Sequence, residues 1–146
     1  MTFVQSAIGR ARIIAAVAIG ATALLAGYAV AHSNDADVRP VYSGALPNVP
    51  GKVLSAVVVT YAPGGKSAAH HHSGSVFAFI LSGEIRSEVT PGGPVKVYKA
   101  GESFFEPPGS SHLVSENASA TEPASLLAVF VADDGATLTL PGAAQP

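Results

Sequence analysis

The chain has 146 residues, a formal net charge of −2 and no cysteine. A chain of this length supports one compact domain, and the missing cysteine excludes disulfides, thiolate metal ligands and a cysteine nucleophile. Beyond position 34 the chain carries ten acidic and six basic side chains, a balance of −4 that offers no basic patch for nucleic acid.

The N-terminal segment has the residue order of an export signal. Arg10 and Arg12 precede an unbroken, weakly apolar run over residues 13–31, and Ala29-Val30-Ala31 fits a small-residue cleavage site. We therefore expect residues 1–31 to be a signal peptide and the remainder to be exported, either periplasmic or secreted. The alternative is an uncleaved anchor, because the run is close to the ~20 apolar residues that cross a bilayer. We expect no other membrane segment.

The rest of the chain has the residue pattern of short strands separated by turns. Residues 32–51 are rich in turn formers and read as a lead-in segment with at most a short strand near Val41, which would add an edge strand to the same or a neighbouring subunit. The strands expected after it are rich in β-branched and aromatic residues and lie between Pro and Gly turns. They are KVLSAVVVTYA, VFAFILSGEIRSEV (two strands hinged at Ser82-Gly83), VKVYKA, ESFFE, SHLVSE, SLLAVFVA and ATLTL. With no apolar stripe of helical period, roughly seven to nine such strands predict an all-β sandwich or barrel.

Three consecutive histidines, His70 to His72, precede one of these strands in a chain that has five histidines. Alternate side chains of an extended strand share a face, so His70 and His72 point one way and His71 the other. Such a pair brings two imidazoles to one point, as the first half of a metal site does. Taken alone, the pattern fits a solvated polar patch equally well.

A further histidine, His112, follows the turn formed by residues 107–110. We expect the segments on either side of this turn to pair as a hairpin about Gly109, which would set Glu106 opposite His112. That pairing would place a carboxylate beside the third imidazole. By the same alternation, Glu116 shares the face of His112 and lies at its rim.

Two stretches resemble the paired motifs of the cupin superfamily, over about residues 52–132. GGKSAAHHHSGSVFAFILSG is similar to the first motif and GESFFEPPGSSHLVSEN to the second, with matching residues Gly64, His70, His72 and Gly83, then Gly101, Pro107, Gly109 and His112. The chain departs from the motifs at two positions. Val76 stands where the first motif has Glu, and Glu116 stands where the second has Asn, with Asn117 one place late.

The resemblance implies a small single-domain exported cupin. The implied fold is a cupin-type β-barrel, a jelly-roll-like double-stranded β-helix, over residues 52–141, and small members of the family imply a homodimer. The family's usual metal set of three His and one Glu is reduced here to His70, His72 and His112. Glu106 is then the candidate for a fourth ligand or for a residue that orients His112 or a bound water. The alternative for Glu106 is a solvent-facing residue at the end of a strand. The implied cofactor is a divalent metal such as Fe, Mn, Ni, Cu or Zn.

The expected function is metal binding beside an apolar pocket for a small organic ligand. The three-histidine set resembles that of dioxygenases that act on thiols and β-diketones, so a dioxygenase-type oxidoreductase is the leading enzymatic interpretation, while the catalytic residues and catalysis itself stay open. The alternatives are a non-catalytic cupin that binds a small ligand or senses metal, and a structural barrel with a degenerate site. The aromatic residues expected in the pocket wall and core are Tyr61, Phe77, Phe79, Phe104 and Phe105.

Overall fold

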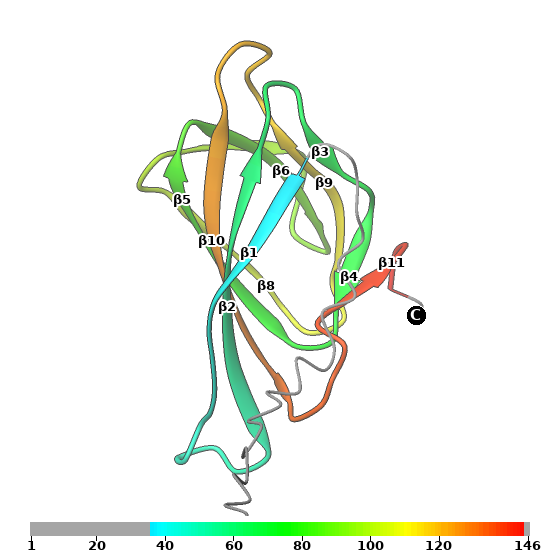
Figure 1. Cartoon of the computed structure of the whole chain (residues 1–146). Coiled ribbons are helices and arrows are strands. Elements are labelled where there is room, and N and C mark those ends of the chain that lie inside the picture. The colour runs from blue at the N-terminus through cyan, green and yellow to red at the C-terminus, as the bar shows by residue number, and fades with distance from the viewer. Residues whose placement is uncertain (1–35, 145–146) are drawn as a thin grey trace, which may run out of the picture.

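The structure is a computed structural model and describes residues 36–144. This part of the chain forms two antiparallel β-sheets packed face to face (Figure 1). The signal peptide expected over residues 1–31 lies outside this range. The described strands, in chain order, are β1 (Ala36–Ala45), β2 (Lys52–Tyr61), β3 (Lys66–Ser67), β4 (His70–His72), β5 (Ser75–Ser82), β6 (Glu84–Thr90), β7 (Lys96–Lys99), β8 (Ser103–Glu106), β9 (Ser111–Asn117), β10 (Ala124–Asp133) and β11 (Thr139–Pro141). The predicted all-β class is confirmed, and residues 36–144 contain no helix that is long and apolar enough to cross a membrane.

The sheets are assembled from strands that are distant in the sequence. One sheet has the order β1-β2-β10-β5-β8, and the other has the order β11-β4-β9-β6-β7, with β3 pairing with β9. The hinge predicted at Ser82-Gly83 is present, because β5 ends in the first sheet and β6 begins in the second. The chain thus passes repeatedly from one sheet to the other, as expected of a jelly-roll-like barrel.

The lead-in segment contains a longer strand than we predicted. β1 pairs with β2 from Ala36 to Ala45, with a shift in register between Pro40 and Tyr42. As the edge strand of its sheet it tolerates a proline, which lacks a backbone N–H, and a bulge. β1 therefore belongs to the sheet of its own chain, and the short strand expected near Val41 was an underestimate.

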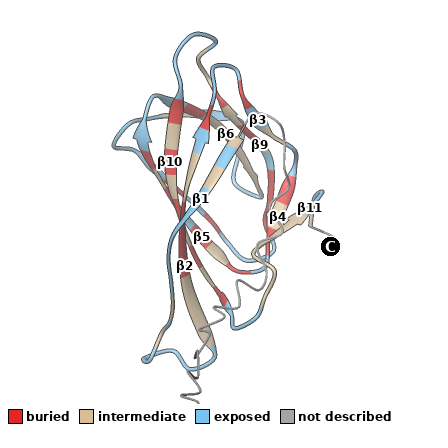
Figure 2. Ribbon diagram, in the orientation of Figure 1, coloured by how far each residue is buried: buried red, intermediate tan, exposed pale blue. Residues whose placement is uncertain are grey.

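The inward faces of the two sheets form the core (Figure 2). Along β10 the buried side chains alternate with half-buried ones, as in a strand with one face toward the core. Tyr61 and Phe104 are buried as predicted, and Phe79 is half-buried. The prediction was wrong for Phe77 and Phe105, which are 44% and 56% exposed, because alternation turns both toward the outer face.

The predicted hairpin about Gly109 does not form. β8 pairs with β5, and β9 pairs with β4 and β6, so the turn over residues 107–110 carries the chain from one sheet to the other. Pro107 and Pro108 lack the N–H groups that a continuing ladder would use. Glu106 consequently approaches His112 across the interior, from the facing sheet, and not from a neighbouring strand.

A β-bulge interrupts the alternation of β9. Consecutive residues Glu88 and Val89 of β6 pair with Val114 and His112, so Leu113 is an extra residue on β9. His112 and Ser115 are therefore both buried although they are three residues apart. Glu116, predicted to share the face of His112, instead makes an ion pair with Arg86 and is half-buried.

Candidate metal centre

Three histidines from two neighbouring strands converge in the interior. His70 and His112 are partners in the pairing of β4 with β9, and His72 follows two residues later on the same face of β4. All three are buried, and one ring nitrogen from each lies within 4.8 Å of the others. The predicted alternation is confirmed, because His71 points away and its Nδ1 lies 2.9 Å from the carbonyl oxygen of Gly142.

Backbone carbonyls orient two of the imidazoles. Nδ1 of His70 lies 2.8 Å from the oxygen of Ala68, and Nδ1 of His72 lies 3.0 Å from the oxygen of Leu138. A carbonyl oxygen only accepts hydrogen bonds, so Nδ1 of each neutral ring carries the proton and Nε2 carries the lone pair. Both rings are thus prepared to bind a cation through Nε2.

His112 contacts one polar side chain through each of its nitrogens. Nε2 lies 2.9 Å from Oγ of Ser87, a buried residue on β6. Nδ1 lies 3.3 Å from Oε1 of Glu106. Ser87 therefore helps to orient this ring, a role for which the sequence offered no signal.

Glu106 brings a carboxylate into the histidine cluster. The residue is 3% exposed, and its Oε2 lies 3.6 Å from Nε2 of His72. Oε2 has no hydrogen-bond partner within residues 36–144. Atoms that ligate one ion at about 2.1 Å are separated by roughly 3.0 to 3.4 Å when adjacent, so the spacing of Glu106 and its neighbours suits a shared cation. A bound ion would also compensate the cost of burying an unpartnered carboxylate oxygen.

The position of Glu106 mirrors that of the missing motif residue. Its partner across the pairing of β5 with β8 is Val76, the residue that stands where the first motif has Glu. Both side chains are buried and face the interior. The carboxylate that β5 lacks is thus present on the strand beside it.

The protonation states of the cluster also suit a cation. Burial lowers the pKa of His70 to about 4, with a further contribution from the neighbouring His112. Burial likewise lowers the pKa of His72, against the opposing influence of Glu106. For Glu106 burial alone would raise the pKa, but the hydrogen bond and charge of His112 and the charge of His72 bring it below its ordinary value. At neutral pH His70 and His72 are therefore uncharged and Glu106 is ionised, the forms that bind metals.

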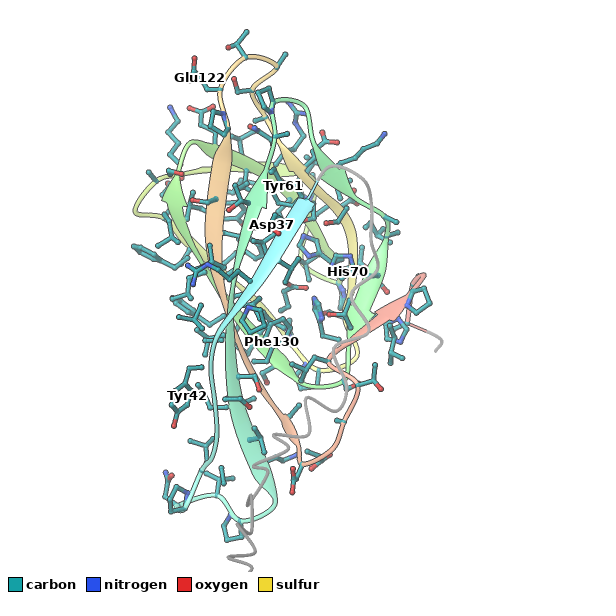
Figure 3. The ribbon with its side chains drawn as sticks, in the orientation of Figure 1. Asp37, Tyr42, Tyr61, His70, Glu122 and Phe130 are labelled. Carbon is teal, nitrogen blue, oxygen red and sulfur yellow. The ribbon has the colours of Figure 1, made fainter. Side chains whose placement is uncertain are left out.

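A cavity of about 110 Å³ adjoins the cluster. Its apolar walls come mainly from the first sheet and include Phe104 of β8 and Phe130 of β10. The polar lining residues are Tyr61, Ser67, His70, His72, Glu106, His112, Ser115 and Thr139. Tyr61 and His70 point into the space between the sheets, whereas Tyr42 points outward (Figure 3). Nothing in the sequence pattern predicted Ser67 or Ser115 in the cavity.

The chain matches a known protein family over its central part. The cupin domain family matches residues 57–130, which include all three histidines and Glu106 and make up half of the chain. None of the curated proteins compared with the chain matches it.

Several solved structures share the fold. The protein TT1209 from Thermus thermophilus is 26% identical, with a TM-score of 0.54 over 70% of this chain and 88% of its own. A cupin superfamily protein from Desulfitobacterium hafniense is 14% identical, with a TM-score of 0.54 over 70% of this chain and 83% of its own. An oxalate oxidase in complex with the substrate analogue glycolate is 22% identical, with a TM-score of 0.56 over 80% of this chain and 60% of its own. The chain therefore spans less than two thirds of that oxidase.

Proposed function

Because this chain belongs to the cupin family, we propose that it binds one divalent metal ion through the three clustered histidines, with Glu106 as a fourth ligand, next to a pocket for a small organic molecule. The observation that carries the proposal is the unpartnered Oε2 of Glu106, buried beside the free Nε2 of His72. A buried carboxylate oxygen without a hydrogen-bond partner is costly in a fold that has no use for it.

The proposed activity is that of a dioxygenase-type oxidoreductase. A bound ion would supply Lewis acidity and, if redox-active, electron transfer to O₂. The protein contributes two imidazoles fixed by backbone carbonyls and a cavity with largely apolar walls. Oxygen uptake by the iron-loaded protein with small thiols and β-diketones tests this activity. Metal binding with no turnover of any such compound would favour the non-catalytic, ligand-binding alternative.

Metal content tests the site itself. We expect about one equivalent of metal in the parent protein after removal and reloading, and little in His70→Ala/His72→Ala, measured by mass spectrometry. His71→Ala is the matched control, because it removes an imidazole from the same triplet that points away from the cluster. Equal metal content in the parent and the double variant would rule out the site and leave the degenerate barrel as the better description.

Export and dimerisation remain part of the proposal. Export is supported by the order of charged, apolar and small residues over positions 1–31. N-terminal sequencing of the exported protein checks for cleavage after Ala31.

A homodimer is supported by the outer face of the first sheet, where Phe77 and Phe105 are cross-strand partners and both are exposed.

A further inference from the structure

We propose that the ligand of the cavity is a small monocarboxylate with a second, uncharged oxygen toward its far end, and that the hydroxyls of Tyr61, Ser67 and Ser115 recognise that second oxygen. This inference rests on the metal centre proposed above, which would hold the carboxylate. The three residues are called the hydroxyl cluster below.

The hydroxyl cluster has one proton to spare. Oη of Tyr61 lies 2.8 Å from Oγ of Ser67 and 2.8 Å from Oγ of Ser115. Three hydroxyl groups carry three protons, and these two hydrogen bonds use one each. The hydroxyls make no other hydrogen bond within residues 36–144. The remaining proton is therefore available to an acceptor atom of a ligand.

The hydroxyl cluster and the metal centre share one cavity but occupy separate parts of it. All three hydroxyl residues line the same cavity as the three histidines. The partners of His112 and Ser115 on β6 are two residues apart, which corresponds to about 7 Å along a strand. Apart from these two groups and Thr139, the lining is apolar. A pocket with two polar points on apolar walls selects a ligand with polar atoms at two places and hydrocarbon between them.

The charges that line the cavity determine which kind of ligand oxygen suits each of its two polar parts. No lysine or arginine lines the cavity. A charged group at the hydroxyl cluster would be buried without a counter-ion, so a ketone, ether or ester oxygen fits better. Burial raises the pKa of Tyr61, which keeps its hydroxyl protonated as a donor. At the other end, a divalent ion with the single charge of Glu106 leaves one positive charge, which one carboxylate neutralises.

The volume limits the size of the ligand. A water molecule needs roughly 10 to 15 Å³ of such space, so about 110 Å³ accommodates about seven to eleven non-hydrogen atoms. Levulinate, a carboxylate with a ketone near its other end, falls within this range. Hexanoate has the same number of non-hydrogen atoms and no second oxygen, so it is the matched comparison.

Isothermal titration calorimetry of the full-length, Zn²⁺-loaded protein with the two acids tests the inference. We expect levulinate to bind about 2- to 12-fold more tightly than hexanoate, the contribution of one hydrogen bond. The variant Tyr61→Phe/Ser67→Ala/Ser115→Ala removes the whole cluster and leaves no buried hydroxyl without a partner, so it is expected to fold. In this variant the two acids should bind equally. Tyr42→Phe, the same chemical change on an exposed tyrosine, should preserve the preference.

Failure of this inference is distinguishable from failure of the metal site. Metal content is measured on the same samples by mass spectrometry, so a protein without metal counts against the proposed function. If metal is bound, equal affinities of the parent protein for the two acids overturn the inference, and so does the failure of both to bind at millimolar concentration. A preference for levulinate that survives loss of the cluster overturns the role of the hydroxyls. If the triple variant does not fold, Tyr61→Phe alone must weaken levulinate binding.

Discussion

At the scale of single residues, Glu106 and Val76 are the residues that most distinguish this site from the cupin motifs. They are partners across two neighbouring strands, and both are buried. A carboxylate at either position would reach the same interior, because both side chains leave the sheet on the same face. The loss of the motif's Glu from β5 therefore does not by itself imply the loss of the site.

Exchange of these two residues tests directly whether the carboxylate of Glu106 is a metal ligand. We expect Glu106→Gln to weaken metal binding by about 10- to 100-fold, because the uncharged amide is a poor ligand. Val76→Glu combined with Glu106→Val should recover most of that loss, since it moves the carboxylate by one strand. The measurement is competition for Zn²⁺ with a chelating dye, and Glu102→Gln, an exposed change, is the control. If Glu106→Gln bound metal as tightly as the parent, the fourth ligand would have to be abandoned.

The lowered pKa of His70 predicts how the stability of the metal-free protein depends on pH. The pKa is about 4 in the folded protein against 6.5 for an unperturbed histidine, so between these values the unfolded chain binds the extra proton. The free energy of unfolding should therefore be fully retained above pH 6.5 and fall as the pH drops toward 4, by on the order of 3 kcal/mol from this residue. Glu106, whose pKa is also lowered, acts in the same direction at the acidic end.

Urea unfolding of the metal-free protein across this pH range checks the prediction. His70→Asn should have a shallower dependence on pH than the parent, because it lacks the group whose pKa shifts. His71→Ala should keep the parent's slope. An identical slope in His70→Asn and the parent would contradict the assignment to His70.

At the scale of elements, the C-terminal segment that contains β11 acts as a support for the metal centre. The carbonyl of Leu138 accepts the hydrogen bond from His72, and Ser73 donates a hydrogen bond to the carbonyl of Thr137. The side chain of Leu138 also lines the cavity. The segment thus fixes both the orientation of His72 and part of the pocket wall.

Truncation separates this support from the rest of the fold. A chain that ends at Gly135 should bind metal about 10- to 100-fold more weakly, because His72 loses the acceptor that orients it. A chain that ends at Pro141 keeps the Leu138 carbonyl and should bind nearly as the full chain does. Chelator competition measures both affinities, and thermal melting checks that both truncated chains fold. Equal affinity of the two truncated chains would show that β11 is dispensable for the site.

The elements also show which parts were predictable from the sequence and why. The facing of His70, His71 and His72 followed from strand alternation, which is a local property. The partner of β8 did not follow, because pairing across the molecule depends on the topology of both sheets. Glu106 was predicted beside His112 through a hairpin that does not exist, and it lies there because the two sheets face each other.

Some residues of the site were not predictable at all. Serine is common in turns and on surfaces, so its presence alone predicts no role. The roles of Ser67, Ser87 and Ser115 follow only from their contacts with Tyr61 or His112 in the folded chain. Tyr61 was expected in the wall as a bulky side chain, and that expectation was confirmed. The contacts of its hydroxyl with Ser67 and Ser115 could not be predicted, because they depend on the positions of two other strands, β3 and β9.

At the scale of the whole molecule, the outer face of the first sheet bears on assembly. β10 and β5 are apolar on both faces, a pattern typical of strands that are covered on both sides. The exposed pair of Phe77 and Phe105 lies on the uncovered side. A second copy of the chain would cover this face symmetrically.

Light scattering after gel filtration tests the homodimer. We expect a dimer for the parent and a monomer for Phe77→Lys/Phe105→Lys, because two charged side chains in each subunit would be buried in the interface. Metal content should be unchanged in this variant, since both side chains point away from the cavity. A parent protein that is monomeric at every concentration would contradict the homodimer.

The bulge at Leu113 changes how the second cupin motif should be aligned. Asn117 is buried and donates hydrogen bonds to the carbonyls of Ala62 and Glu122, so it occupies an interior position that Glu116 does not. Leu113 is the additional residue of the strand. If the alignment places a one-residue gap there, His112 is followed by three residues and then Asn117, which is the motif's own spacing. The apparent replacement of Asn by Glu is then an insertion, and the chain has kept the asparagine.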